Sequence, residues 1–148
     1  MNRWQTWSQN ALRIVTGLLF MQHGAQKLFG WLGGMGGSGA TAELFSQMGL
    51  AGVLEFFGGA LIALGLFTRP VAFVLAGEMA VAYFQAHLPR GFFPILNGGE
   101  PAALFCFIYL FLAAHGGGSF SVDDVLQRRK AGAAAEAGDR TEEPVAAH

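Results

Sequence analysis

The segment ALRIVTGLLFMQHGAQKLFGWLGG, residues Ala11–Gly34, begins as an apolar stretch and ends in polar and aromatic residues. A helix that crosses a lipid bilayer needs about 20 such residues, and this segment has that length. Steps of four, three and four place four of its residues on one helical face: Thr16, Phe20, His23 and Lys27. An ionisable stripe in a membrane-spanning helix is costly unless it faces protein or water. We therefore expect the other helices of the chain to cover it.

The composition of the whole chain also indicates a lipid environment. Of its 148 residues, 53% are apolar and 13% are charged, whereas a typical soluble domain has about 25% charged residues. The length suits a single domain. The formal net charge of −1 argues against a nucleic-acid partner, because such proteins usually carry a basic surface. The composition therefore predicts a single-domain integral membrane protein.

Four apolar segments, separated by glycine, proline or charged residues, predict four membrane-spanning helices. Their expected bounds are about 11–32, 50–67, 70–88 and 101–115. No segment alternates apolar and polar residues as a half-buried strand does, so the expected fold class is all-α. We expect a four-transmembrane-helix bundle over residues 11–118, preceded by a short N-terminal segment at 1–10. The loop that contains Phe92 and Phe93 is expected to form a structured cap or a re-entrant hairpin.

Basic residues predict the orientation of this bundle. Four spans place both termini on the same side of the membrane, and most arginine and lysine residues lie on that side, whereas Lys27 and Arg90 lie near the other. The positive-inside rule then puts both termini in the cytoplasm, with the bundle in the inner membrane. Residues 119–148 become a cytoplasmic tail. Its stretch from Ser121 to Lys130 suits a short helix, and the small, polar and acidic residues that follow predict disorder.

Three separate motifs carry a family resemblance. They are HGAQKLFGWLGG (His23–Gly34), LEFFGGALIALGLFTR (Leu54–Arg69) and HLPRGFFPILNGGE (His87–Glu100). In this order they resemble the DoxX family of small bacterial membrane proteins, over roughly residues 11–120. The resemblance implies a four-helix membrane domain. It also implies similarity to the small membrane subunit of thiosulfate:quinone oxidoreductases and, for some relatives, a link to membrane oxidoreductase complexes.

The chain reads as two helical hairpins with similar polar residues. Each hairpin has a histidine followed by a base on its first helix and a glutamate where its second helix begins, which hints at an internal duplication. Five of these residues form the candidate site at the outer end of the bundle: His23, Lys27, Glu55, His87 and Glu100. Lys27 is expected to pair with Glu55 or Glu100, because buried charges in a membrane must pair or neutralise.

Two further features of the second and third spans bear on this site. Small residues share a helical face with the glutamate of the second span and should press it against a neighbouring helix: Gly52, Glu55, Gly59 and Ile62. Glu78, near the middle of the third span, needs a partner from another helix, such as Thr16 or Tyr109, or it is protonated.

The candidate site suggests quinone chemistry. A histidine, a lysine and carboxylates beside aromatic rings are able to hydrogen-bond the carbonyls of a quinone and to exchange its protons. Candidate quinone contacts are Gln26, Phe92 and Phe93, with the two phenylalanines as a cap. The chain has no dinucleotide-binding glycine motif and no cysteine cluster, so electrons are expected to come from a partner oxidoreductase or from the quinone itself. We therefore interpret the protein as a membrane component of an oxidoreductase system, without assigning catalysis to it.

Other interpretations stay open. The polar residues also suit a structural network that fixes helix register, and a scaffold that anchors a soluble partner needs no pocket. A transporter for a small solute or protons uses the same residue types, but four short helices require a homo-oligomer. A haem between His23 and His87 is less favoured, because two histidines at matching depth arise by chance. No metal site is expected.

Overall fold

The computed structural model describes the backbone of residues 3–141, with side chains through residue 134. Within this range the chain is helical, and the β-type pairing present is an isolated bridge between Met35 and Ala40. The expected all-α class is confirmed for the described residues. Two helical segments are long and apolar enough to cross a membrane, Gln47–Leu64 and Thr68–Arg90, and the apolar helix Glu100–His115 is shorter.

The first helix, α1 (Arg3–Phe29), starts earlier than expected. The structure extends it to Arg3, rather than beginning near residue 11, because its first turns pack against the loop after α6. Gln9 donates to the carbonyl of Gly116 at 3.0 Å, and the ring of Trp7 lies 5.4 Å from that of Phe120. Gly30 then ends the helix with a φ of 68°, a left-handed conformation that glycine adopts without strain. A short 3₁₀ turn, η1 (Trp31–Gly33), follows.

The second predicted span is one helix built from three pieces. They are α2 (Gln47–Val53), the π-helical turn η2 (Leu54–Gly58) and α3 (Gly59–Leu64). Ser46 caps the start, because its hydroxyl accepts a hydrogen bond from the amide of Gly49 at 3.1 Å. The helix therefore begins and ends about three residues before the expected 50–67.

The third predicted span is also composite, and the fourth is a plain helix. α4 (Thr68–Ala82) continues into a second π-helical turn, η3 (Tyr83–His87), and a 3₁₀ turn, η4 (Leu88–Arg90). The expected cap contains the four-residue helix α5 (Pro94–Asn97), and α6 (Glu100–His115) returns alongside α4.

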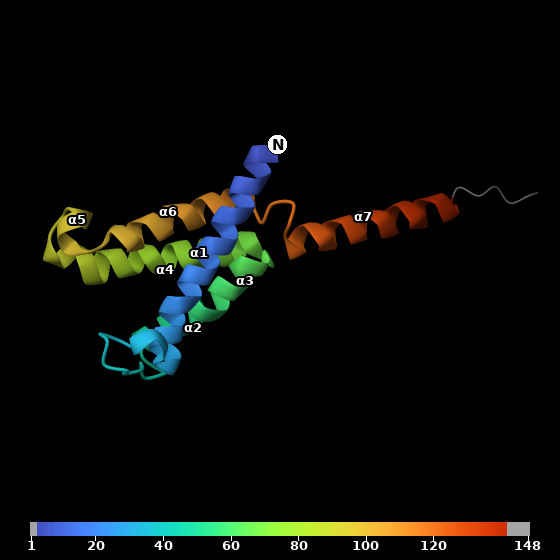
Figure 1. Cartoon of the computed structure of the whole chain (residues 1–148). Helices are drawn as coiled ribbons and strands as arrows, with labels where there is room; N and C mark the ends of the chain where they lie inside the picture. The colour runs from blue at the N-terminus through green and yellow to red at the C-terminus, as the bar shows by residue number, and fades with distance from the viewer. Residues whose placement is uncertain (1–2, 142–148) are drawn as a thin grey trace, which may run out of the picture.

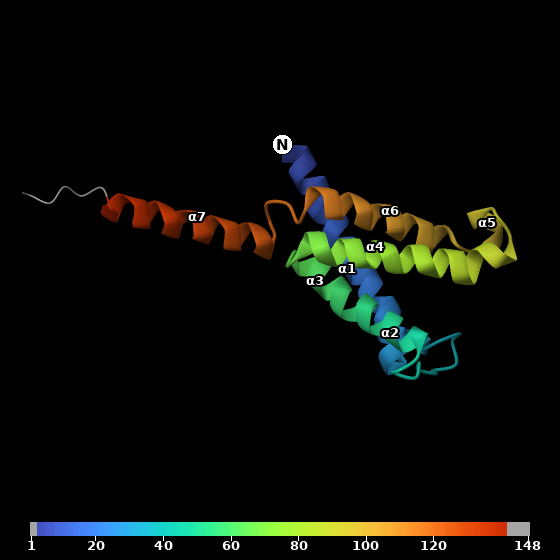
Figure 2. The same ribbon diagram turned by 180° about the vertical axis from the view of Figure 1, so that it is seen from behind.

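The helices form two hairpins, and within each hairpin two helices pack against each other (Figure 1). The first hairpin packs α1 against the helix α2–η2–α3, and the second packs α4 against α6. The hairpins cross, and their far ends, marked by α2 in one and α5 in the other, point apart in both views (Figures 1 and 2). The expected bundle is therefore two crossed antiparallel pairs rather than helices aligned over their whole length.

The core lies where the hairpins cross. Phe20 of α1 and Ile62 of α3 meet Leu75 of α4 and Tyr109 and Leu112 of α6, and each of these side chains is almost fully buried. Large apolar side chains elsewhere are exposed on the helices. Buried apolar area thus holds the crossing together, and the outward faces remain apolar, as expected for helices in contact with lipid.

The tail helix α7 (Val122–Thr141) is longer than the short helix expected up to Lys130. The stretch after Lys130 is rich in alanine, which has the highest helix propensity, and the helix continues through it. α7 projects away from both hairpins (Figure 1). The rest of the tail for which we expected disorder, residues 142–148, lies outside the described residues.

Candidate functional site

The centre of the candidate site is a buried ion pair in the first hairpin. The ammonium of Lys27 on α1 donates to both carboxylate oxygens of Glu55, at 2.7 Å to Oε1 and 2.5 Å to Oε2. The Lys27 side chain is 18% exposed and that of Glu55 is 5% exposed. Charge-assisted bonds of this kind strengthen where water is excluded. Of the two partners expected for Lys27, the structure selects Glu55.

Glycines bring the two helices of this hairpin close enough for the pair to form. A Cβ on Gly17 would lie 2.7 Å from the backbone nitrogen of Ala63, and one on Gly59 would lie 2.7 Å from the carbonyl oxygen of Gly17. A Cβ on Gly24 would lie 2.7 Å from the Cα of Phe56. Small residues allow such close backbone approach. The expected packing of Gly52, Glu55, Gly59 and Ile62 is confirmed, since all four are buried.

Each hairpin has one π-helical turn, and each turn contains a candidate residue. Glu55 lies in η2 and His87 lies in η3. A π-turn inserts an extra residue into a helix and rotates the side chains around it, and such turns occur frequently at functional sites. In η2, Glu55 is one of these rotated side chains, and it packs against α1.

His23 and Gln26 lie on α1 near the ion pair but are not bonded to it. His23 is exposed, and its ring packs edge-on against Phe105 of α6 at 6.2 Å. Gln26 donates to the carbonyl of Leu32 at 3.3 Å. His23 therefore faces the second hairpin, whereas Gln26 ties α1 to the turn that follows it.

The candidate residues of the second hairpin form a separate cluster beneath α5. Nδ1 of His87 lies 3.2 Å from the carbonyl oxygen of Asn97, and its ring stacks on Tyr83 at 6.3 Å. Asn97 is buried, donates to the carbonyl of Gly91 and accepts from the amide of Gly99, both at 2.7 Å. Tyr83 donates to the carbonyl of Phe92 at 3.0 Å. The cap is thus an ordered unit built on His87 and Asn97.

The other candidates of this hairpin face outward. Glu100 is exposed, and Phe92 and Phe93 are 75% and 62% exposed. Within residues 3–141, no hydrogen bond or ion pair joins Lys27 or Glu55 to the cluster around His87. The structure thus divides the five-residue candidate site into two halves, and the phenylalanines do not cover the ion pair.

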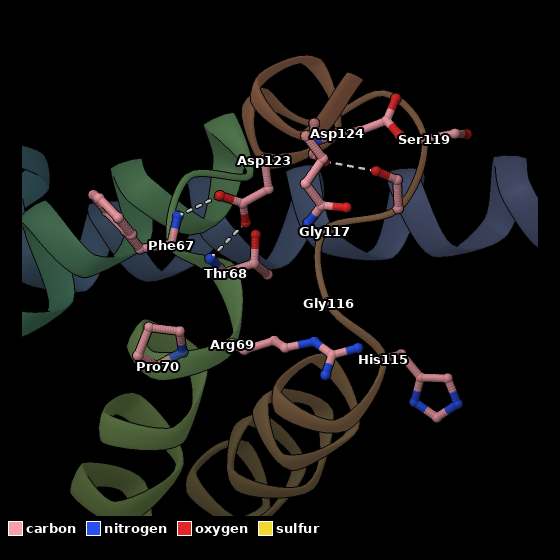
Figure 3. Close-up of a pocket in the computed structure, with 13 residues that line it drawn as sticks. Phe67, Thr68, Arg69, Pro70, His115, Gly116, Gly117, Ser119, Asp123 and Asp124 are labelled. Atoms are coloured by element: carbon pink, nitrogen blue, oxygen red, sulfur yellow. Dashed lines mark hydrogen bonds between the residues drawn. The ribbon is translucent and has the colours of Figure 1, made fainter. Parts of the chain in front are cut away.

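The described part of the molecule has hollows at both ends of the first hairpin. A groove of about 620 Å³ on the first hairpin is mostly apolar, with one amide. Its lining residues are Leu18, Met21, Gln22, Ala25, Trp31, Leu32 and Phe56. A cavity of about 410 Å³ lies at the opposite end of the hairpins, between the starts of α4 and α7 (Figure 3). There Asp123 accepts from the amides of Phe67 and Thr68, at 2.8 and 2.9 Å, and Arg69 reaches toward the loop that begins at Gly116.

Three polar residues with structural roles were not singled out from the sequence. Asn97 precedes a glycine, which is a turn signal, but nothing in the sequence indicates that it organises the cap. Arg13 is 1% exposed and donates to the carbonyls of Ile62, Ala63 and Phe120. Asp123 caps α4 across a separation of 55 residues, which no local pattern reveals.

Metal ligands do not cluster in this region. Among the described residues, no group of three or more histidine, cysteine, aspartate or glutamate side chains is placed to hold a metal ion. His23 contacts Phe105 and His87 contacts Asn97, so the described contacts do not pair the two histidines around a haem.

Comparison with known proteins identifies relatives of the chain. A family model described as DoxX matches residues 9–88. An uncharacterised protein of Haemophilus influenzae (strain ATCC 51907 / DSM 11121 / KW20 / Rd) is 43% identical over 117 residues, which cover 76% of this chain and 86% of the relative. No solved structure matches the chain.

Proposed function

The chain belongs to the DoxX family of membrane proteins, and on that premise we propose that it is the integral membrane component of a quinone-linked oxidoreductase system. The observation that carries the proposal is the buried Lys27–Glu55 ion pair between two helices of a chain whose solvent is lipid. Ionisable residues inside a membrane are expensive and are usually functional. This pair supplies proton-exchanging groups, and a partner protein supplies the electrons.

We propose that the quinone ring binds in the groove of the first hairpin. A quinone has an apolar tail and two carbonyl oxygens, and the groove offers apolar walls with the amide of Gln22 and the rings of Trp31 and Phe56. Phe56 directly follows Glu55 in the chain, but neither Glu55 nor Lys27 lines the groove, so proton exchange between the ion pair and the quinone is not direct. This placement replaces the contacts expected from Phe92 and Phe93, which belong to the other hairpin and point outward.

The proposed orientation has four spans in the inner membrane and both termini in the cytoplasm. The support for it is the concentration of basic residues in the tail, where Arg128, Arg129 and Lys130 follow one another on α7. The far ends of both hairpins, with Lys27 near the end of α1, then face the outer leaflet.

Extraction of the purified protein tests this function. We would purify the chain in mild detergent and measure quinone in the lipid extract by mass spectrometry and absorbance. Co-purifying quinone is expected for the parent protein and for Phe92→Ala, and its loss is expected for Gln22→Leu. Loss in Phe92→Ala with retention in Gln22→Leu would move the site to the second hairpin. Absence of quinone from the parent protein would overturn the proposal.

A membrane scaffold is the second candidate, and α7 is the observation that favours it. This 20-residue helix projects away from the hairpins and offers its surface to a soluble partner (Figure 1). A scaffold would bind its partner equally well with Glu55→Gln, whereas the oxidoreductase component would lose quinone reduction in that variant while still binding the partner.

A further inference from the structure

Glu78 is a partly buried ionisable residue, with buried carboxylate oxygens, that the proposed quinone site does not use. It lies on α4, one helical turn beyond Leu75, whose side chain is 1% exposed. Both carboxylate oxygens of Glu78 are buried, and neither has a hydrogen-bond partner among the described residues. An ionised carboxylate without a partner is costly in an apolar interior.

Glu78 and Glu55 each lie close to a contact between the two hairpins. A Cβ on Gly58 would lie 2.8 Å from a methyl group of Leu75, so these residues meet where the first hairpin crosses α4. Three residues further along α4 is Glu78, and three residues earlier on the facing helix is Glu55. Both Glu55 and Lys27 act electrostatically on Glu78. Three helices thus bring one ammonium and two carboxyl groups to the same place.

Lys27, Glu55 and Glu78 balance in charge only if one of the two carboxyl groups is protonated. Lys27 directs its ammonium to both oxygens of Glu55, which leaves Glu78 without a counter-charge. Tyr109 of α6 is a further ionisable residue of this core, and its hydroxyl donates instead to the carbonyl of Thr16 at 3.3 Å. We infer that Lys27, Glu55 and Glu78 form a site that holds one exchangeable proton, carried by Glu78 while Lys27 pairs with Glu55.

The site has a second arrangement with the same charge. The Glu78 side chain rotates until its O–H reaches Glu55, the O–H bond breaks as the proton passes to the Glu55 carboxylate, and the Lys27 ammonium moves from Glu55 to the newly ionised Glu78. No electron moves, and the number of protons and charges stays the same. Because the second hairpin contributes Glu78, the exchange couples the two hairpins to each other. This inference shares the Lys27–Glu55 pair with the proposed function but does not depend on quinone.

Carbodiimide labelling tests where the proton resides. Dicyclohexylcarbodiimide reacts with protonated carboxyl groups in apolar surroundings, and peptide mass spectrometry locates the label. In quinone-free protein reconstituted in liposomes, we expect the label on Glu78 and its absence in Glu78→Gln. In Glu55→Gln, Lys27 has Glu78 as its remaining partner, so Glu78 becomes ionised and labelling falls to the level of Glu78→Gln. The matched control Glu100→Gln alters an exposed carboxyl and should leave labelling unchanged.

Infrared spectroscopy provides a second measurement that does not depend on access of the reagent. The parent protein should show the carbonyl stretch of a protonated carboxyl, and Glu78→Gln should lack it. Label on Glu55 instead of Glu78, undiminished labelling of Glu78 in Glu55→Gln, or absence of both the label and the infrared band would overturn the inference. Such a result would leave quinone extraction unaffected, and failure of quinone to co-purify would leave the labelling result standing.

Discussion

The two hairpins contain similar polar residues, yet they use them differently. In the first hairpin the half-buried base Lys27 pairs with the buried glutamate Glu55. In the second hairpin the corresponding Arg90 and Glu100 are both exposed, and His87 bonds to the backbone of the cap. The difference follows from packing. Glycines allow α1 and its partner helix to touch through their backbones, so charges on that interface are shielded from water and must pair. The surroundings of a charged residue, more than its place in a repeated pattern, thus decide its role.

Separating the helices of the first hairpin should have the largest effect. Gly24→Val adds side-chain atoms where even a Cβ would lie 2.7 Å from backbone atoms of the facing helix. Backbone cannot yield as a side chain does, so we expect a loss of about 3 kcal/mol or more in the free energy of unfolding. The measurement is reversible unfolding in mixed micelles. Gly77→Ala is the control, because nothing lies within 4 Å of its added Cβ, and it should be neutral or stabilising by up to about 1 kcal/mol.

Removing one partner of the ion pair tests the contrast between the hairpins directly. Lys27→Met leaves Glu55 buried without its counter-charge, which should destabilise the protein by about 3 kcal/mol. Arg90→Met, the equivalent change in the second hairpin, alters an exposed side chain and should change stability by less than about 0.5 kcal/mol. Similar losses in both variants would show that the hairpins are more alike than their burial indicates.

The cap of the second hairpin should respond to loss of its buried amide. Asn97→Ala removes the bonds to Gly91 and Gly99 and leaves their backbone groups unpaired, at an expected cost of about 2 kcal/mol. Hydrogen exchange should accelerate in residues 88–100 while α1 keeps its protection. Equal acceleration in both hairpins would mean that the cap is not an independent unit.

The smallest effect is expected from a change in the connection between the hairpins, where Asp123 of α7 caps the start of α4. Asp123→Asn weakens the cap that the carboxylate provides to the amides of Phe67 and Thr68. An N-cap contributes about 1 kcal/mol, and the loss should appear as a lower unfolding temperature with the Lys27–Glu55 pair intact. We expect carbodiimide labelling of Glu78 to be unchanged in this variant. Its loss would show that the Asp123 cap and the Lys27–Glu55–Glu78 site depend on each other.

Much of the fold follows from apolar patterning, whereas the assembly of the hairpins does not. The four helical segments and the buried face around Glu55 are visible in the sequence, because helical periodicity and small residues are local signals. The π-turns leave no recognisable pattern. The crossing of the hairpins depends on shape matching among residues such as Phe20 and Tyr109, which are distant in the chain. Separation of the candidate site into two halves follows from that crossing, and so it was not foreseen.

Arg13 lies on the first helix, but some of its hydrogen-bond partners are synthesised much later. Its guanidinium donates hydrogen bonds to the carbonyls of Ile62 and Ala63 in α3 and of Phe120 in the loop between α6 and α7. The first helix is therefore made 107 residues before one of the groups that anchor it. Until the ribosome has released that segment, a buried cation lacks part of its coordination, which is costly in an apolar surrounding. Insertion of the early helices and completion of the Arg13 hydrogen bonds are thus separate events, and the second waits for synthesis of the segment that contains Phe120.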